Sequence, residues 1–595
     1  MIKKPKKLLV TTALKDTWIK GENIIFLGEW CKKYNEKHIW GKEKFKTIRW
    51  HLLDRKKNKQ DHDYLTALYE KVLSDLVKKL NNIHSVNFSK RYWRIILGPW
   101  LLNYIPVLWD RWENLRVFAS FNIKCETYVS KKKINDILVD DYSKANILMN
   151  RNDTWNYFLY LDILRFQNFK NIELVYRDID FEDFNTQINA YDNLTKKNSF
   201  IYYFKLIVDR IISTIIQKKH YKFIIFESYF PIKFLFNLFY KLKIVPSIYY
   251  QFSKEINYKN LDFLIRPKFK KIKGSNKFEK FLYQRIFKDM PKTYLEVYKE
   301  LSNYCEKLPT ANIIYTSNAH FRNEIFKIWS AKQVINGSKL IIGQHGGAIP
   351  ALSNSFNHED KICDKKTVWH TRLISKHEKL SINKIVDTNF SSKNKNQITL
   401  VGLDFNRYYN KCGFAPLSSA LLLDFNQKIK FINLLKKNIK VNLKIRPYQA
   451  REWHTKKRYI DIFGKKILST DKTLYDNFKN SKLLICTYPQ TTFNEAMNSG
   501  KPTIMLYLDK FWEHHPVFHE LIVKMKKAQI IHSDPIKAAE HVNRIAANPK
   551  VWWYNKKTVE AKKMFYNLCG SISDDPLSEY TNFFNKINKE FHKKK

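Results

Sequence analysis

Short β-rich runs alternate with longer helical stretches along most of the 595-residue chain. This alternation predicts an α/β protein with mainly parallel sheets, because parallel strands need a long crossover connection, usually a helix. Helices are expected near 64–84 and 131–150. The expected strands are residues 8–13, 171–178, 222–229, 245–252, 312–318, 339–347, 397–404, 441–448, 482–489, 502–507 and 529–534.

Two Rossmann-like domains that face a cleft are the most economical organisation for these elements. The first domain is expected over 1–385, with a large, mostly helical insertion at about 20–150. A Ser-, Asn- and Lys-rich stretch at 375–397 predicts an exposed connection. The second domain then occupies 396–550, and a Trp-containing helical tail occupies 551–595.

Composition excludes a mainly disordered chain, since 44% of the residues are hydrophobic and 15% are aromatic. No apolar run approaches the roughly 18–20 residues that span a bilayer. The seven cysteines are scattered and form no CxxC pair, so neither a disulfide framework nor a zinc ribbon is indicated. The N-terminus lacks the apolar core of a secretory signal. We therefore expect a cytoplasmic protein.

The chain carries 106 Lys and Arg against 56 Asp and Glu, a formal net charge of +50. A charge of this size favours anionic partners such as phosphorylated ligands, an anionic membrane surface or nucleic acid. Compositional drift that fills solvated positions with lysine is the simplest explanation, and peripheral docking at the inner membrane face comes next. Nucleic acid is the least favoured partner, because none of its compact sequence signatures is present.

The most informative segment is 473–507, in which a buried strand leads to a hydroxyl-rich turn and a new helix. Gln490, Thr491 and Thr492 form the turn, and Glu495 lies one turn inside the helix. Hydroxyl groups at a helix start cap free N–H groups, and the same N-terminus attracts phosphate. Nucleotides dock here in open α/β sheets, and the Glu495 carboxylate suits ribose hydroxyls. An ordinary N-cap with a solvated glutamate is the alternative.

Glycine is scarce, with 14 residues in the chain, yet Gly343, Gly346 and Gly347 lie in one loop. Such a loop lets backbone amides approach a ligand closely. Gln344 and His345 are expected at the mouth of the sheet, facing the cleft. His345 is suited to bind phosphate or to act as acid or base near neutral pH; a satisfied structural histidine is the alternative.

Polar residues follow two further predicted strands. Glu227 is a candidate general base for an acceptor hydroxyl, or else a glutamate favoured by a helix dipole. Ser317, Asn318 and His320 form a similar polar turn and are expected to line the acceptor side.

The segment FWEHHPVFHE at 511–520 is rich in aromatic and imidazole side chains. It does not fit the HExxH zinc template. A lid over donor or acceptor is the preferred interpretation, with Trp512, His514 and His515 in the cleft. We predict no metal site in the chain.

The order of strand, hydroxyl-rich turn, x-E-A-x-x-x-G-x-P and strand resembles the donor-nucleotide half of GT-B glycosyltransferases and of the related nucleotide-sugar 2-epimerases. The strand VNLKIRPYQ at 441–449 strengthens this resemblance. Several GT-B families place a His-Pro pair at this strand end to contact the donor phosphate. This chain has Arg446 and Pro447, and a guanidinium still offers a charged bidentate fork for phosphate. Pairing of Arg446 with a carboxylate is an equal alternative.

Longer motifs resemble one particular transferase family, found in bacterial O-antigen and capsule gene clusters. These motifs are FLGEWCKKY (26–34), the helical run at 51–84, RYWRIILGPWL (91–101), GQHGG (343–347), TTFNEAMNSGKPTI (491–504) and NPKVWW (548–553). The resemblance spans nearly the whole chain. TVWHT at 367–371 departs from the family's expected Trp-Gly-Trp-like element.

The resemblance implies a glycosyltransferase that moves a sugar from a nucleotide-activated donor to a growing surface polysaccharide. A CMP-linked acidic sugar would fit Arg446 and the basic field. The acceptor would be lipid-linked or an oligosaccharide, and GT-B chemistry ordinarily needs no protein-bound metal or other cofactor. The alternatives are a nucleotide-sugar 2-epimerase, a glycerophosphate-type polymer transferase, and a non-catalytic basic protein that binds membrane or nucleic acid.

Overall fold

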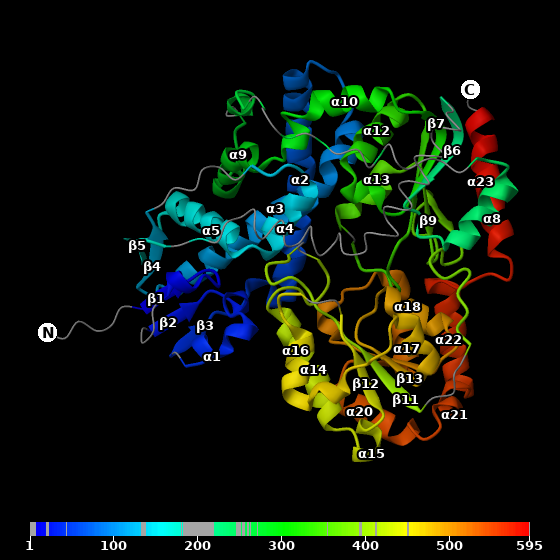
Figure 1. The fold of residues 1–595 in the computed structure, drawn as a ribbon. Helices are drawn as coiled ribbons and strands as arrows, with labels where there is room; N and C mark the ends of the chain where they lie inside the picture. The colour runs from blue at the N-terminus through cyan, green and yellow to red at the C-terminus, as the bar shows by residue number, and fades with distance from the viewer. Residues whose placement is uncertain are drawn as a thin grey trace.

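The structure is a computed structural model that describes residues 7–593 with gaps. The residues left out within this span are 19–22, 43, 132–137, 180, 182–218, 246–251, 253–255, 257, 259–260, 262, 270–271, 354, 392–395, 411–412 and 449–450. Most of the strand predicted at 245–252 lies outside the described residues. The fold is α/β with parallel sheets, as predicted, but the described strands form three five-stranded sheets instead of two (Figure 1).

The N-terminal sheet has the strand order β3-β2-β1-β4-β5, with all pairs parallel. Its strands are β1 (Lys7–Val10), β2 (Asn23–Phe26), β3 (Phe45–Thr47), β4 (Cys125–Ser130) and β5 (Ile172–Arg177). Because β2 and β4 pair directly with β1, the segment 20–150 is not an insertion into a sheet formed elsewhere, and this part of the prediction is wrong. With only 4 and 3 residues, β2 and β3 are too short to show a periodic pattern.

Two long helices lie between the N-terminal and middle sheets (Figure 1). Helix α2 (Arg55–His84) begins at Asp54, whose carboxylate accepts hydrogen bonds from two first-turn amides. Helix α3 (Lys90–Ser120) contains Pro99 and Pro106 and is buried on most sides. It packs on helices next to both sheets, among them α4 (Tyr142–Arg151), α5 (Asp153–Gln167) and α12 (Glu324–Ile335). In the part of the chain that the structure describes, no helix is long and apolar enough to cross a membrane.

The middle sheet has the order β10-β9-β8-β7-β6, again with all pairs parallel. Its strands are β6 (His220–Phe226), β7 (Thr310–Thr316), β8 (Lys339–Gly343), β9 (Lys365–Val368) and β10 (His377–Lys379). In the centre, Ile314 of β7 lies opposite Ile224 and Leu340 of its two neighbours. The polar stretch at 375–397, predicted as a connection, therefore begins with the last strand of this sheet.

The C-terminal sheet has the order β12-β11-β13-β14-β15 and is also parallel. Its strands are β11 (Gln397–Val401), β12 (Leu443–Arg446), β13 (Ser481–Cys486), β14 (Thr503–Leu506) and β15 (Ile531–His532). Helix α17 (Leu474–Asn480) opens with a capping box between Thr473 and Asp476 and delivers the chain into β13. Helix α18 (Thr491–Asn498) follows β13 directly.

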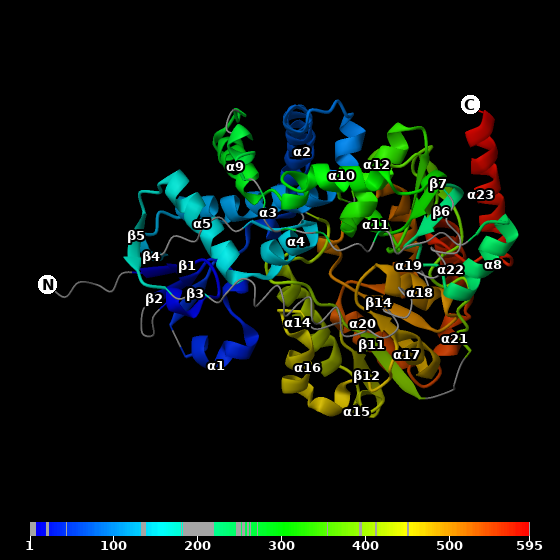
Figure 2. The same cartoon turned by 45° about the horizontal axis from the view of Figure 1, so that its top comes forward.

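The C-terminal helices join the middle and C-terminal sheets. After α21 (Pro549–Trp553), helix α22 (Lys556–Cys569) packs on α19 (His519–Lys527), which connects β14 to β15 of the C-terminal sheet. Helix α23 (Pro576–Lys593) then packs beside α8 (Ile232–Leu242) on one face of the middle sheet. Figure 2 shows α23 and α8 together at the edge of the molecule far from the N-terminal sheet.

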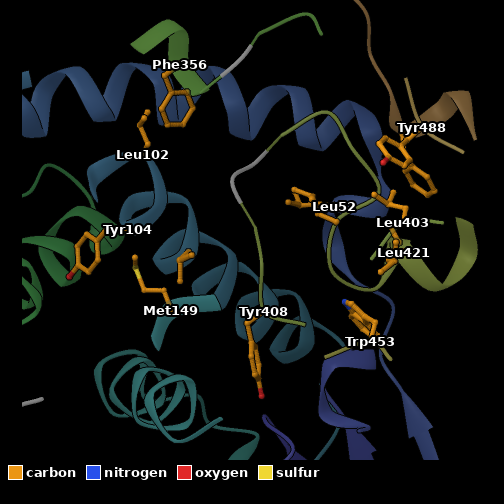
Figure 3. Close-up of a cluster of buried hydrophobic side chains, with 14 of the residues drawn as sticks. Leu52, Leu102, Tyr104, Met149, Phe356, Leu403, Tyr408, Leu421, Trp453 and Tyr488 are labelled. Atoms are coloured by element: carbon orange, nitrogen blue, oxygen red, sulfur yellow. The ribbon is translucent and has the colours of Figure 1, made fainter. Parts of the chain in front are cut away.

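Buried apolar side chains from all three sheets merge into one large core. Figure 3 shows part of it, where Leu52 and Leu102 from the N-terminal helical region share a cluster with Leu403 and Tyr408. The latter two follow β11 of the C-terminal sheet, so the loop after this strand reaches into the N-terminal part of the molecule.

Candidate active site

The glycine-rich loop after β8 meets the first turn of α18, which belongs to the C-terminal sheet. The Gly347 N–H donates to Thr491 Oγ1 over 2.9 Å. A Cβ atom on Gly346 would lie 2.8 Å from the same oxygen, so the close approach requires glycine. Gly347 has a φ of +108°, which other residues rarely adopt. We call this contact between the loop and α18 the glycine junction.

Backbone pairing extends the glycine junction along the next residues of the loop. Ala351 and His514 form an isolated antiparallel β-bridge, and the Leu352 N–H donates to the Glu513 carbonyl over 2.8 Å. The Glu513 carboxylate in turn accepts two hydrogen bonds of 2.7 Å from Arg55, at the start of α2. Strand ends of the middle and C-terminal sheets are thus held together next to the long helices.

The predicted lid at 511–520 packs against this loop. Trp512 and His514 are buried, and the His514 ring lies 3.3 Å from the Tyr507 hydroxyl. Burial lowers the pKa of His514 to about 4. His515 accepts a hydrogen bond at the start of a short 3₁₀ helix. The structure therefore gives these side chains packing partners, and their role over a ligand stays a prediction.

Gln344 shapes the glycine-rich loop from within. Its side-chain Nε2 donates to the Gly346 carbonyl over 2.9 Å, and its Oε1 accepts the Trp369 N–H over 2.8 Å. The Trp369 indole then donates to Asn383 Oδ1. Gln344 thus links the loop to the end of β9 and fixes its conformation.

The Glu359 carboxylate lies close to two histidines that belong to different predicted motifs. Its Oε1 lies 3.4 Å from His320 Nε2 and 3.8 Å from His345 Nδ1, and its Oε2 lies 2.9 Å from Lys366 Nζ. Burial alone would raise the pKa of this carboxyl group, but Lys366 and the histidines hold it well below its usual value. Glu359 is thus a buried anion that holds His345 at the loop and His320 in the core.

The turn after β6 places Glu227 in a strained backbone conformation. Glu227 and Tyr229 have φ values of +47° and +62°, in the left-handed region that non-glycine residues seldom occupy. Although part of Glu227 reaches solvent, reduced hydration raises its pKa above the usual value, opposed by Arg322 and by a hydrogen bond with Asn318. Ser317 instead donates to the Ser228 carbonyl, so it holds the turn.

The Tyr229 ring connects this turn to the glycine-rich loop. It stacks near the His345 ring, with 6.1 Å between the ring centroids. The turn that carries Glu227 therefore contacts the loop that carries His345 through the Tyr229 ring, at the carboxyl ends of β6 and β8.

Glu495 is buried inside the first turns of α18. Its Oε1 lies 2.8 Å from Lys384 Nζ and accepts a hydrogen bond from the Tyr475 hydroxyl, whereas its Oε2 has no hydrogen-bond partner among the described residues. Thr492 Oγ1 pairs with the Tyr488 hydroxyl, and Gln490 occupies the N-cap position without a side-chain cap bond. Gln490, Thr491 and Thr492 thus form the N-terminus of α18, and Glu495 lies below the surface.

A sequence model of the LIC12162 family transferases matches residues 7–584. The chain belongs to this family. None of the curated proteins matches it significantly. The protein is thus a transferase, and the α18 segment and the glycine-rich loop lie within the matched span.

In this LIC12162 family transferase, the Arg446 side chain points toward the backbone of a neighbouring loop. Its guanidinium donates to the carbonyls of Asp471 and Lys472. Arg446 ends β12, and β11 separates β12 from β13, the strand that leads to α18. At ordinary strand spacing β12 and β13 lie about 10 Å apart. A phosphate role for Arg446 stays a prediction. Among the described residues, the partners of its guanidinium are backbone carbonyls and not a carboxylate.

Three further charged residues, two of them at the site, were not predicted from the sequence. Glu359 and Lys384 act through contacts with residues 14–111 positions away, and short motifs carry no signal for such contacts. Asp404, after β11, is buried, and burial raises its pKa to about 6 despite hydrogen bonds from Thr455. The one signal in the sequence is its place as the last residue of the strand predicted at 397–404.

In the described ranges, no group of three or more His, Cys, Asp or Glu side chains has the arrangement that holds a metal ion.

Proposed function

We propose that this transferase moves a sugar from a nucleotide-activated donor to a growing surface polysaccharide, with the middle and C-terminal sheets in a GT-B-like arrangement. The observation that carries the proposal is the glycine junction. There the loop after β8 meets the N-terminus of α18, at the carboxyl ends of two parallel sheets. Ligands bind at such strand ends, and phosphate suits a helix N-terminus with an adjoining glycine-rich loop.

In this proposal the donor phosphate lies against the amides of α18 and the loop at Gly346. The ribose hydroxyls reach the unpartnered Glu495 Oε2, which is buried while the junction is closed. Donor entry therefore separates the loop from α18, and the direct bond to be broken is the one between Gly347 and Thr491. A neutral hydrogen bond of this kind contributes about 1 kcal/mol.

The proposed chemistry uses the cluster at β6 and β8. The acceptor hydroxyl loses its proton to Glu227 and its oxygen bonds to the anomeric carbon, while the bond from that carbon to the phosphate oxygen breaks and the nucleotide leaves. A raised pKa makes Glu227 a better base near neutral pH. His345, held by Glu359, then stabilises charge on the departing phosphate.

Finer features of the proposal follow from charge. A CMP-linked acidic sugar fits the net charge of +50 and the guanidinium of Arg446. No divalent ion is required, since basic side chains and the helix N-terminus act on the leaving group. The acceptor is lipid-linked or an oligosaccharide, which fits a cytoplasmic enzyme at the inner face of the plasma membrane.

A thermal-shift panel of CMP-, UDP-, dTDP-, GDP- and CDP-linked sugars tests the donor site. A ligand at about 100 times its Kd adds about 2.7 kcal/mol of stability. We expect one nucleotide class to raise the Tm of the wild-type protein. Glu495→Ala and Arg446→Ala should reduce that shift, while Arg372→Ala, at a side chain 65% exposed, should retain it. No shift with any nucleotide, or equal shifts in all variants, would contradict the proposal.

Product analysis then separates the related activities. A glycosyltransferase leaves the sugar nucleotide intact until an acceptor is added, whereas a 2-epimerase converts it without one. For turnover, Glu227→Gln should lower kcat more than it weakens donor binding. Full turnover in that variant would exclude Glu227 as the base.

A further inference from the structure

Helix α8 has apolar side chains on both of its faces, although it lies at the surface of the molecule (Figures 1 and 2). On its inner face, four side chains are buried against the middle sheet and α23: Phe234, Leu238, Phe239 and Leu242. On its outer face, Ile232, Phe236 and Tyr240 are 58%, 59% and 84% exposed. A surface helix of a soluble protein normally presents a polar outer face, so the outer face of α8 calls for a second partner.

The three exposed residues form a continuous stripe. Their spacing of four residues keeps them within about 80° of the helix circumference. Lys233 and Lys241 are exposed along one side of the stripe and lie within about the next 100°. The eleven residues of α8 include no Asp or Glu, and exposed Lys243 follows directly. We call Ile232, Phe236, Tyr240, Lys233 and Lys241 the α8 face.

The α8 face lies next to the candidate active site. The turn that carries Glu227 and Tyr229 leads through Pro231 into the first turn of α8. Tyr229 is itself 43% exposed and stacks near His345. A surface bound to the start of α8 would therefore lie beside the acceptor side of the site.

We propose that the α8 face docks this transferase onto an anionic phospholipid bilayer. Ile232, Phe236 and Tyr240 enter the headgroup region, and Lys233 and Lys241 lie against lipid phosphates. Interfacial helices combine such an apolar stripe with flanking lysines, and anionic lipids attract each lysine near the surface. Nucleic acid would leave the apolar stripe uncovered, and a second copy of a chain with a net charge of +50 would be repelled electrostatically.

This docking deepens the proposed function, because it would bring a lipid-linked acceptor to Glu227. The test of membrane docking needs no sugar nucleotide. A failure of the docking proposal is therefore distinguishable from a failure of the proposed glycosyltransferase function. The full-length protein is sedimented with phosphatidylcholine vesicles that contain or lack phosphatidylglycerol, at low and high salt. We expect binding to the anionic vesicles and weaker binding at high salt.

Variants then locate the contact. The triple change Ile232→Ser, Phe236→Ser and Tyr240→Ser should weaken vesicle binding more than about tenfold, since three large side chains lose their lipid environment. Lys233→Gln and Lys241→Gln should each weaken it about fivefold on anionic vesicles only. The matched control changes three exposed apolar residues elsewhere to serine and should bind as the wild type does: Val523 in α19, Val551 in α21 and Tyr554 just after α21.

Several outcomes would overturn the proposal. Absence of binding to anionic vesicles would do so, as would equal losses in the α8 and control triple variants. Sedimentation equilibrium without lipid gives a further check: a dimer that the α8 triple variant abolishes would assign the face to a second copy of the chain. If the triple variant unfolds, the two lysine variants still decide the question, because both side chains are exposed.

Discussion

The C-terminal sheet contacts its two neighbours through junctions of opposite chemistry. Toward the N-terminal sheet, buried Asp153 accepts a hydrogen bond from Arg407 over 2.8 Å, lies 2.9 Å from Lys33 Nζ and also binds the Tyr408 hydroxyl. We call these four residues the charged junction. Toward the middle sheet, the glycine junction relies on backbone groups and the Thr491 hydroxyl.

The chemistry of each junction determines the free-energy cost of separating the parts of the molecule that it joins. Burial alone would raise the pKa of Asp153, but Arg407 and Lys33 hold it well below its usual range. The Asp153 carboxylate therefore stays ionised in the charged junction. Loss of one ion would leave the other charge buried without compensation. The contacts between the loop after β8 and the C-terminal sheet at the glycine junction are neutral and individually weak, although the ion pair of Lys384 with the buried Glu495 lies close by. We therefore expect the loop after β8 to separate from α18 at a lower free-energy cost, where the proposed donor enters.

The largest expected effect comes from breaking the charged junction. Asp153→Asn removes the carboxylate charge and leaves Arg407, whose side chain is 2% exposed, without it. We expect the free energy of unfolding to fall by about 3 kcal/mol, measured by denaturant titration. Asp461→Asn, at an exposed residue, is the control and should change stability little. Equal losses in the two variants would show that the charged junction is not a stabilising feature.

As the pH falls, we expect the glycine junction to lose stability at a higher pH than the charged junction does. The pKa of His514 is about 4 in the folded protein and about 6.5 when unfolded, so between these values the unfolded state binds the extra proton. Stability should therefore fall as pH drops from 7 to 5, by about 2 kcal/mol from His514 alone.

Tm measurements across this pH range test the assignment. His514→Gln should flatten the dependence of Tm on pH, while the exposed control His38→Gln should leave it unchanged. An unchanged slope in His514→Gln would mean that His514 titrates normally in the folded protein. His84, His370 and His532, whose pKa values burial also lowers to about 4, contribute in the same direction in every variant.

The smallest expected effect comes from the bond across the glycine junction. Thr491→Val removes the acceptor for the Gly347 N–H and should lower the free energy of unfolding by about 1 kcal/mol. Thr491→Ser keeps the hydroxyl and should stay closer to the wild type. A loss in Thr491→Val as large as that in Asp153→Asn would remove the contrast between the two junctions.

Much of the fold follows from local pattern. The predicted strand at 312–318 overlaps β7, and those at 441–448 and 502–507 contain β12 and β14, because short apolar runs between turn residues bury both faces of a parallel strand. The number of sheets did not follow from this pattern, since an apolar run records burial and not the identity of the neighbouring strand. The one domain expected at 1–385 therefore contains two sheets, and the short strands β2 and β3 carry no pattern that predicts them.

The sequence alone determined the short-range elements of the site: the glycine loop whose backbone needs glycine at 346 and 347, and the threonines that open α18. Its motifs also indicated a transferase, and a transferase family model matches residues 7–584. Only the tertiary structure decided that Thr491 meets Gly347, that Glu359 gathers His320 and His345, and that Arg446 turns to backbone carbonyls. The physical reason is range, because capping and backbone strain act between adjacent residues, whereas ion pairs and burial depend on which distant segments the packing brings together.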